Sequence, residues 1–362
     1  MVWAAGKFSS RSMMEDRFDI ADNGVVWGFP LRGKSVLELS RTGAAAFFRL
    51  GRIKCGKFGE LSVLPEKFRL HRSEDAADAE LESSGVIPFG CEYRVVRDFR
   101  VSCGCASFTT DISAVTGGRV DGIELEPLTF AGEMTKVEFL IFGEDKFRTA
   151  ELPTEGTLYS GNEVPLLIRA TYADGLRCEM ALGGDVWRHR AAFGIEGAES
   201  EYELAASGGE LKLTRRVLKY APEVEPERRP WRFTSLIGWN DGTAPSEPSG
   251  EAFELPGCAM SATNRRDLRA RVRRSTASLD WREVSPKVCR DAAHVSRAGR
   301  GELAHFDLEE LLAAWRWANR QLGRSGAHLT LTPKPGGLFA DSVILNCLGR
   351  PAGKLDSCGG RE

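Results

Sequence analysis

The chain has 362 residues, of which 42% are hydrophobic and 28% charged, and its formal net charge at pH 7 is −2. A chain of this length can form one large β domain or two smaller ones. A net charge so close to zero creates no global field that would attract nucleic acid or an anionic membrane, so neither is an expected partner.

Nine cysteines are spread along the sequence without regular spacing. A secreted disulfide framework usually has an even and dense set, so we expect mostly reduced thiols and a cytoplasmic location. The N-terminal sequence has no apolar run long enough for a signal peptide, and no later segment approaches a membrane span. Neither C-x-x-C nor H-x₃-H occurs, so we expect no bound metal, and nothing points to a cofactor.

The first third of the chain contains several short strand-like runs. Residues 1–17 are small and polar without a period, and we expect them to be loosely ordered. Asn23-Gly24 lies between two apolar runs, which is a hairpin signal, and further short strands are expected as far as Leu70. The acidic segment 73–82 has no evident apolar face, which predicts an exposed loop or a frayed helix.

The strand pattern returns at Tyr93, with glycine and Asp-Gly between the runs. Turn residues between short strands favour antiparallel sheets over repeated βαβ units. The stretch 164–220 predicts two hairpins, whose turns are Ala173-Asp174-Gly175 and Gly208-Gly209. Tight turns of this kind need positive φ, which glycine adopts at little cost.

The C-terminal third is less regular. The Pro-rich segments 221–230 and 242–257 predict long loops. The run 264–300 has eleven Lys or Arg against four Asp or Glu, and predicts either a strand with solvated arginines or a face that docks an acidic partner. An apolar stripe predicts a helix over 307–322, and residues 349–362 form a flexible tail.

Together these elements predict a mainly β fold. We expect a large antiparallel β-sandwich in a single domain over residues 18–348, which includes one C-terminal amphipathic helix at 307–322.

Residues 28–35 match the phosphate-binding pattern G-x-x-x-x-G-K-[ST]. In such a loop backbone amides hold phosphates, Lys34 reaches the terminal phosphates and Ser35 ligates Mg²⁺, while Gly28 and Gly33 shape the loop. The motif requires a strand before it and a helix after it, and the following segment is short and soon reaches Gly43. Nucleotide binding is therefore kept as an alternative function.

A polar, aromatic segment lies between the two central hairpins. Trp187 could stack on the apolar face of a sugar ring, and His189 could act as a catalytic proton carrier near neutral pH. The other polar side chains could hold hydroxyls or a carboxylate: Asp185, Arg188 and Arg190. The alternative is a surface strand with its arginines in water and His189 partly buried.

Two further groups of residues have chemistry suited to a sugar. Trp239 and Asp241, at the end of a predicted strand, could supply a stacking ring and a carboxylate. The carboxylates Glu124, Glu126 and Glu179 lie on predicted strands, and two of them could catalyse sugar chemistry if the fold brought them together.

The many antiparallel strands, the chain length and the Trp/Arg/His segment resemble the galactose-mutarotase-type super-sandwich. That superfamily comprises aldose epimerases and sugar-binding domains of glycosidases and lyases, and the resemblance covers roughly residues 18–348. It implies a concave sheet face that binds a small-molecule carbohydrate. The family's enzymes pair a histidine with a glutamate, but no family motif aligns with His189 or with a glutamate here, so no catalytic role is transferred.

Three functions are consistent with the sequence. The first is a carbohydrate-binding or carbohydrate-converting protein with acid–base chemistry and no cofactor. The second is a nucleotide-binding protein that uses residues 28–35. The third is a non-catalytic interaction module that docks through residues 264–300.

Overall fold

A computed structural model describes a large part of the chain. The described residues are 3–7, 17–22, 24–30, 35–54, 60–62, 66–72, 77–86, 92–102, 105–114, 118–119, 122–141, 144, 146–182, 201–217, 223–224, 231–240, 251–255, 258–262 and 329–333. They contain strands and no helix. Every strand pairing among them is antiparallel. The predicted mainly β, antiparallel sandwich is confirmed.

Two ten-stranded sheets form the body of the fold. The first sheet contains, in spatial order, β1 (Trp3–Lys7), β8 (Lys67–Arg72), β9 (Ala77–Val86), β10 (Glu92–Ser102), β11 (Cys105–Ala114), β22 (Trp231–Asn240), β18 (Arg177–Leu182), β17 (Pro165–Tyr172), β14 (Met134–Ile141) and β15 (Arg148–Glu151).

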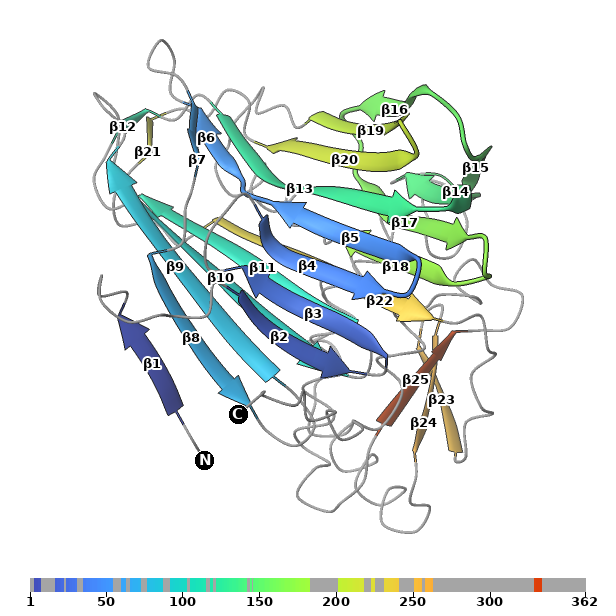
Figure 1. Ribbon diagram of the computed structural model, residues 1–362, viewed down its shortest axis with the longest axis horizontal. Helices are drawn as coiled ribbons and strands as arrows, with labels where there is room; N and C mark the ends of the chain where they lie inside the picture. The colour runs from blue at the N-terminus through green and yellow to red at the C-terminus, as the bar shows by residue number, and fades with distance from the viewer. Residues whose placement is uncertain are drawn as a thin grey trace.

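The second sheet lies over the first in Figure 1. Its strands, in spatial order, are β16 (Gly156–Gly161), β19 (Glu201–Ser207), β20 (Glu210–Val217), β13 (Gly122–Gly132), β5 (Ala44–Arg49), β4 (Ser35–Arg41), β3 (Val25–Pro30) and β2 (Arg17–Asp22). Two short strands extend this sheet beside β13. β6 (Arg52–Lys54) pairs with β13, and β7 (Glu60–Ser62) pairs with β6.

Two small sheets complete the described strands. One pairs β12 (Gly118–Arg119) with β21 (Glu223–Val224), and the other contains β23 (Glu251–Leu255), β24 (Cys258–Ala262) and β25 (Leu329–Pro333). The predicted helix 307–322, the basic run 264–300 and the tail 349–362 lie outside the described residues. The single domain over 18–348 stays a prediction.

One hydrophobic core fills the space between the two large sheets. The sequence produces it by alternation, because successive side chains of a strand point to opposite faces. β19 shows the pattern clearly, with Tyr202, Leu204 and Ala206 buried and the residues between them partly exposed. Aromatic rings join the sheets: Phe48 of β5 meets Phe108 of β11 edge to face at 4.6 Å between ring centroids.

Both central hairpins form as predicted. Gly175 has a φ of +84° in the turn between β17 and β18, where Leu176 N donates a 2.9 Å hydrogen bond to Asp174 Oδ1. Gly208 and Gly209 have φ values of +59° and +79° between β19 and β20. The two hairpins nevertheless belong to different sheets, because β17–β18 joins the first sheet and β19–β20 the second.

Several sequence predictions are corrected by the strands. The predicted long loops 221–230 and 242–257 contain the strands β21 and β23. Residues 3–7, expected to be loosely ordered, form the edge strand β1 against β8. Within the acidic segment 73–82, residues 77–82 belong to β9 rather than to a loop or helix. The apolar face of β9 consists of Ala77, Ala79 and Leu81, which point into the core. Because two of these side chains are small, the face is hard to recognise in the sequence.

Helices able to cross a bilayer, with the necessary length and apolar character, are absent from the described residues.

Candidate functional site

The first sheet has an outer face, which we define as the face turned away from the second sheet. Along β17, Ile168 and Ala170 belong to the core between the sheets, so Arg169 between them points to the outer face. The same alternation places Glu138 of β14 and Glu179 of β18 on this face. The cross-strand register sets Glu138, Arg169 and Glu179 side by side, and we call these three residues the polar row.

Arg169 connects the two carboxylates of the polar row. Its Nη2 donates a 3.0 Å hydrogen bond to Glu179 Oε1, and its Nη1 lies 3.6 Å from Glu138 Oε2. The ring of Phe147 covers the guanidinium at 5.3 Å from Cζ to the centroid. The side chains of Arg169 and Glu179 are 5% and 0% exposed, whereas Glu138 is 20% exposed. Among the described residues, Arg169 Nε has no hydrogen-bond partner.

An apolar row runs beside the polar row on the outer face. The strand register aligns four side chains across neighbouring strands: Leu140, Leu167, Ala181 and Leu236. All four are at most 3% exposed, although none belongs to the core between the sheets. The outer face therefore has an apolar strip next to a charged one, and the apolar strip is itself enclosed.

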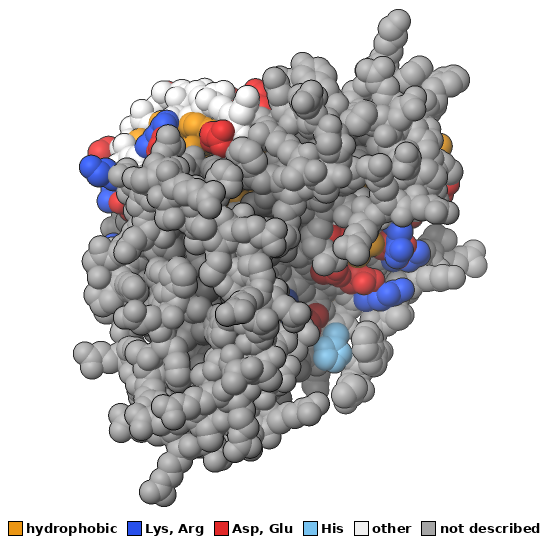
Figure 2. All heavy atoms as spheres, turned by 180° about the vertical axis from the view of Figure 1, so that it is seen from behind, with side chains coloured by type: hydrophobic (Ala, Val, Ile, Leu, Met, Phe, Trp, Pro, Cys, Tyr) orange, Lys and Arg blue, Asp and Glu red, His pale blue; other side chains and the backbone are white. Residues whose placement is uncertain are grey.

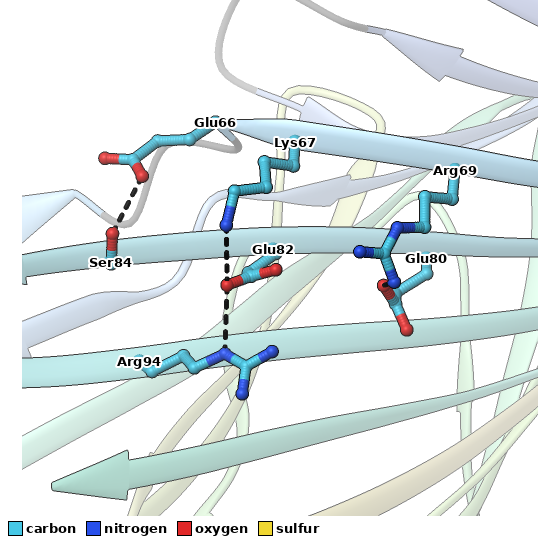
Figure 3. Close-up of polar contacts among 7 residues, drawn as sticks. All are labelled: Glu66, Lys67, Arg69, Glu80, Glu82, Ser84 and Arg94. Atoms are coloured by element: carbon cyan, nitrogen blue, oxygen red, sulfur yellow. Dashed lines mark hydrogen bonds and ion pairs between the residues drawn. The ribbon is translucent and has the colours of Figure 1, made fainter. Parts of the chain in front are cut away.

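The other end of the outer face carries paired charges. Figure 2 shows acidic and basic side chains close together beside a histidine, on the right of the view. The acids come from β9 and the bases from its neighbours. Lys67 Nζ and Arg94 Nε each donate a 3.0 Å hydrogen bond to Glu82 Oε1, from opposite sides in Figure 3. The bond from Lys67, reinforced by Arg94, lowers the pKa of the Glu82 carboxyl despite its burial.

The same pairing continues along β9. Arg69 donates to Glu80 at 3.0 Å, and Arg100 donates to Asp78 at 3.2 Å. Among the described residues of this end of the outer face, acids and bases therefore alternate, whereas polyanion binding requires charge of a single sign.

A second buried charged cluster lies between the two sheets. Arg97 of β10 donates from Nε to Glu126 Oε1 of β13 at 2.5 Å, and both side chains are 1% exposed. Thr110 Oγ1 donates to the other carboxylate oxygen at 3.1 Å, and Arg215 Nη2 lies 4.0 Å from it. Burial alone would raise the pKa of Glu126, but the charges of Arg97 and Arg215 outweigh it and lower the pKa.

A cavity of about 10 Å³ adjoins this cluster, with Arg97, Thr110 and Glu126 in its lining. By this measure about 10–15 Å³ is needed for one water molecule, so the cavity cannot admit a sugar ring. The cluster is therefore a link between the sheets. It also separates the predicted carboxylates, because Glu126 lies between the sheets and Glu179 on the outer face.

The predicted site segment, with Asp185, Trp187, Arg188, His189 and Arg190, lies outside the described residues. It begins three residues after β18 ends at Leu182, which pairs with Ser235 of β22.

Asp241 also lies outside the described residues, directly after β22 ends at Asn240. Asn240 pairs with Arg177, at the other end of β18 from Leu182. The two segments therefore leave the sheet at opposite ends of β18, about 17 Å apart for a strand of this length. The strand register does not bring them together at one rim.

Trp239 does not lie on the outer face. It points into the core, is 2% exposed and stacks on Tyr172 with 5.7 Å between ring centroids. Its predicted role as a platform for a sugar is wrong for this conformation, because both the ring and its stacking partner are enclosed between the sheets.

The described residues at both ends of the predicted phosphate loop 28–35 belong to strands. Gly28 lies in β3 and Ser35 begins β4, and these neighbouring strands pair antiparallel. A phosphate-binding loop needs a helix after it, whose N-terminal amides face the phosphates. Ser35 is instead 5% exposed and accepts a 3.2 Å hydrogen bond from Arg49 Nη1. Gly33 and Lys34 lie outside the described residues.

Sequence reasoning missed Glu138 and Arg169 altogether. The available signal was a charged residue inside the apolar strand 165–172, since arginine is almost never fully buried without a partner. That signal could indicate Arg169, but it could not name Glu138, which is 31 residues earlier in the chain. Within the described residues, no group of three or more His, Cys, Asp or Glu side chains is arranged to hold a metal ion.

No family model matches the chain, and no curated protein matches it. Among solved structures it is similar to an α-N-acetylgalactosaminidase from Bifidobacterium bifidum, with 11% identity, 63% of this chain covered and a TM-score of 0.43. The chain spans only 36% of that enzyme's length.

Two shorter proteins are similar over nearly their whole length. The Slr1438 protein from Synechocystis sp. PCC 6803 has 10% identity, with 64% of this chain and 100% of that chain covered and a TM-score of 0.39. A galactose mutarotase-like protein from Clostridium acetobutylicum has 9% identity, with coverage of 62% and 94% and a TM-score of 0.34. A galactose mutarotase-like protein is thus among the solved structures to which the chain is similar. At these identities the likeness concerns the fold alone.

Proposed function

We propose that the protein binds or converts a carbohydrate on the outer face of the first sheet. The observation that supports this most directly is the polar row, in which the Glu138 side chain is 20% exposed on the outer face. A sugar ring has hydroxyls around its edge, and its site needs a few well-placed polar groups. Carboxylates accept hydrogen bonds from hydroxyl groups, and Glu138 is the carboxylate of the polar row that solvent reaches.

The segment that follows β18 completes this proposal. Trp187 would supply a stacking ring, with Asp185, Arg188 and Arg190 as hydrogen-bonding groups around it. For conversion of the sugar, His189 would exchange a proton with the ring oxygen or a hydroxyl while a carboxylate takes the opposite role, without a cofactor. A cytoplasmic location remains part of the proposal.

The first test addresses the segment. We expect a thermal-shift screen against neutral sugars to find a ligand that raises the midpoint by about one to two degrees at ten times its dissociation constant. Trp187→Ala should then weaken binding roughly tenfold, because an aromatic contact of this kind contributes about 0.5–1.5 kcal/mol beyond its area. His189→Ala should abolish any conversion while retaining binding. Unchanged binding and turnover in both variants would remove the segment from the site.

The second test addresses the polar row. Arg169→Lys keeps the positive charge between the two carboxylates but removes the planar fork and Nε, so we expect about tenfold weaker sugar binding by calorimetry. Arg100→Lys is the matched control, since Arg100 lies on the same face in an exposed pair with Asp78. Equal affinity in Arg169→Lys and Arg100→Lys would show that the polar row has a structural role only.

A further inference from the structure

One end of the sandwich has two open sheet edges. β15 is the last strand of the first sheet and β16 the last strand of the second, and they lie beside each other in Figure 1, where Arg148 of β15 covers the ring of Tyr159 of β16. Among the described residues, β15 pairs only with β14, and β16 only with β19. We propose that this end of the sandwich is a self-association surface, on which β15 pairs antiparallel with β15 of a second copy of the chain.

The backbone of β15 has two residues whose hydrogen-bonding groups point away from β14. Leu152 N donates a 2.8 Å hydrogen bond to Thr135 O at the start of β14, so the backbone groups of Leu152 face β14. Because these groups alternate in direction along an antiparallel strand, those of Ala150 also face β14, whereas those of Thr149 and Glu151 face away from it. The N–H and C=O groups of Thr149 and Glu151 therefore form the open edge of the first sheet.

The edge of β15 is accessible and regular. The side chains of Arg148, Thr149 and Glu151 are exposed, and the pairing with β14 has no bulge. β16 is less suited to a partner strand, because a bulge between Thr157 and Tyr159 interrupts its pairing with β19. Bulges and prolines protect strand edges from pairing with another chain, and the four residues of β15 contain neither. Of the two edges at this end, β15 is therefore the one that a second copy can extend.

One register uses the open groups of both copies. When Thr149 of each copy lies opposite Glu151 of the other, a two-fold axis passes beside Ala150, and each opposed pair can exchange both of its backbone hydrogen bonds. A register with Glu151 opposite Glu151 would place like charges together, which is destabilising. A register with Thr149 opposite Thr149 would place Glu151 opposite Phe147, which precedes β15. The geometry of the edge therefore favours the pairing of Thr149 with Glu151.

The side chains are complementary in this register. Thr149 and Glu151 lie on the outer face, as their register with β14 requires, so the Thr149 hydroxyl of each copy can donate to the Glu151 carboxylate of the other. On the opposite face Ala150 meets Ala150 of the second copy. Ala150 and Leu152 pack against the core but are only partly buried. Covering them with a second copy would remove apolar surface from water, which favours association.

Sedimentation velocity of the full chain tests the proposal. Up to about 100 µM we expect the 39.7 kDa monomer to be in reversible equilibrium with a dimer. Thr149→Pro removes an N–H that faces away from β14, and proline is tolerated at such positions of an edge strand. The dimer of this variant should dissociate at least about tenfold more readily, because the same hydrogen bond is lost in both copies. Its urea unfolding at low protein concentration should match that of the wild type.

Glu151→Lys tests the same edge without a change in the backbone, and it alone decides if Thr149→Pro alters urea unfolding. It removes the acceptor for the Thr149 hydroxyl, so the dimer should weaken at least about threefold. Glu66→Lys is the matched control, because Glu66 is exposed at the other end of the first sheet, where it accepts a hydrogen bond from Ser84 (Figure 3). Association should be unchanged in this variant. A chain that stays monomeric at every concentration, or a dimer that Glu151→Lys weakens no more than Glu66→Lys does, would overturn the proposal.

Discussion

Glu126→Ala is expected to destabilise the protein by about 3–5 kcal/mol, because it removes the carboxylate that the buried Arg97 contacts. Arg97 comes from the first sheet, and Glu126 and Arg215 from the second, so the change removes a link between the layers. Urea unfolding followed by tryptophan fluorescence measures the loss. Glu80→Ala breaks an exposed pair and should cost about 1 kcal/mol or less. Equal losses in the two variants would contradict the buried link.

The same carboxylate predicts a dependence on pH. The pKa of Glu126 is below its ordinary value of 4.5 in the folded state, owing to Arg97 and Arg215. A carboxyl whose pKa falls on folding adds stability above its unfolded pKa and loses it as the pH drops through the folded pKa. The wild type should therefore lose stability below about pH 4.5 more steeply than Glu126→Gln. Parallel curves would mean that another group controls acid unfolding.

Phe108→Ala should also destabilise the protein by about 3–5 kcal/mol, by leaving a cavity at the centre of the core. Phe108 is 1% exposed and contacts Phe48 of the opposite sheet at 4.6 Å and Phe99 of its own sheet at 5.5 Å. Two layers therefore lose packing at once.

Phe47→Ala is the matched control for Phe108. Phe47 neighbours Phe48 on β5 but points away from the core and is partly exposed. Its replacement should cost about 1 kcal/mol, as measured by the same urea titration. A loss from Phe47→Ala as large as that from Phe108→Ala would mean that the aromatic contacts between the sheets contribute little.

The site could be predicted only in part. A polar aromatic segment such as 185–190 can be found by inspection, because its residue types are themselves the signal. The polar row cannot be found in this way, since Glu138 and Arg169 meet only through the pairing of β14 with β17. Trp239 shows the opposite failure. Its position at a strand end pointed to the surface, but whether a strand residue faces the core depends on the register of neighbouring strands.

The sequence by itself determined the mainly β character of the chain and its two central hairpins. Glycines at 175, 208 and 209 fix the turns, and the alternation of residue types along a strand separates its two faces, because both effects act within a few residues. Only the tertiary structure decided that β17–β18 and β19–β20 enter different sheets, and that Gly28 and Ser35 belong to two paired strands. It also decided that Glu126 meets Arg97 between the layers while Glu138, Arg169 and Glu179 align on the outer face. These outcomes depend on contacts between residues far apart in the chain, and local sequence patterns do not predict such contacts.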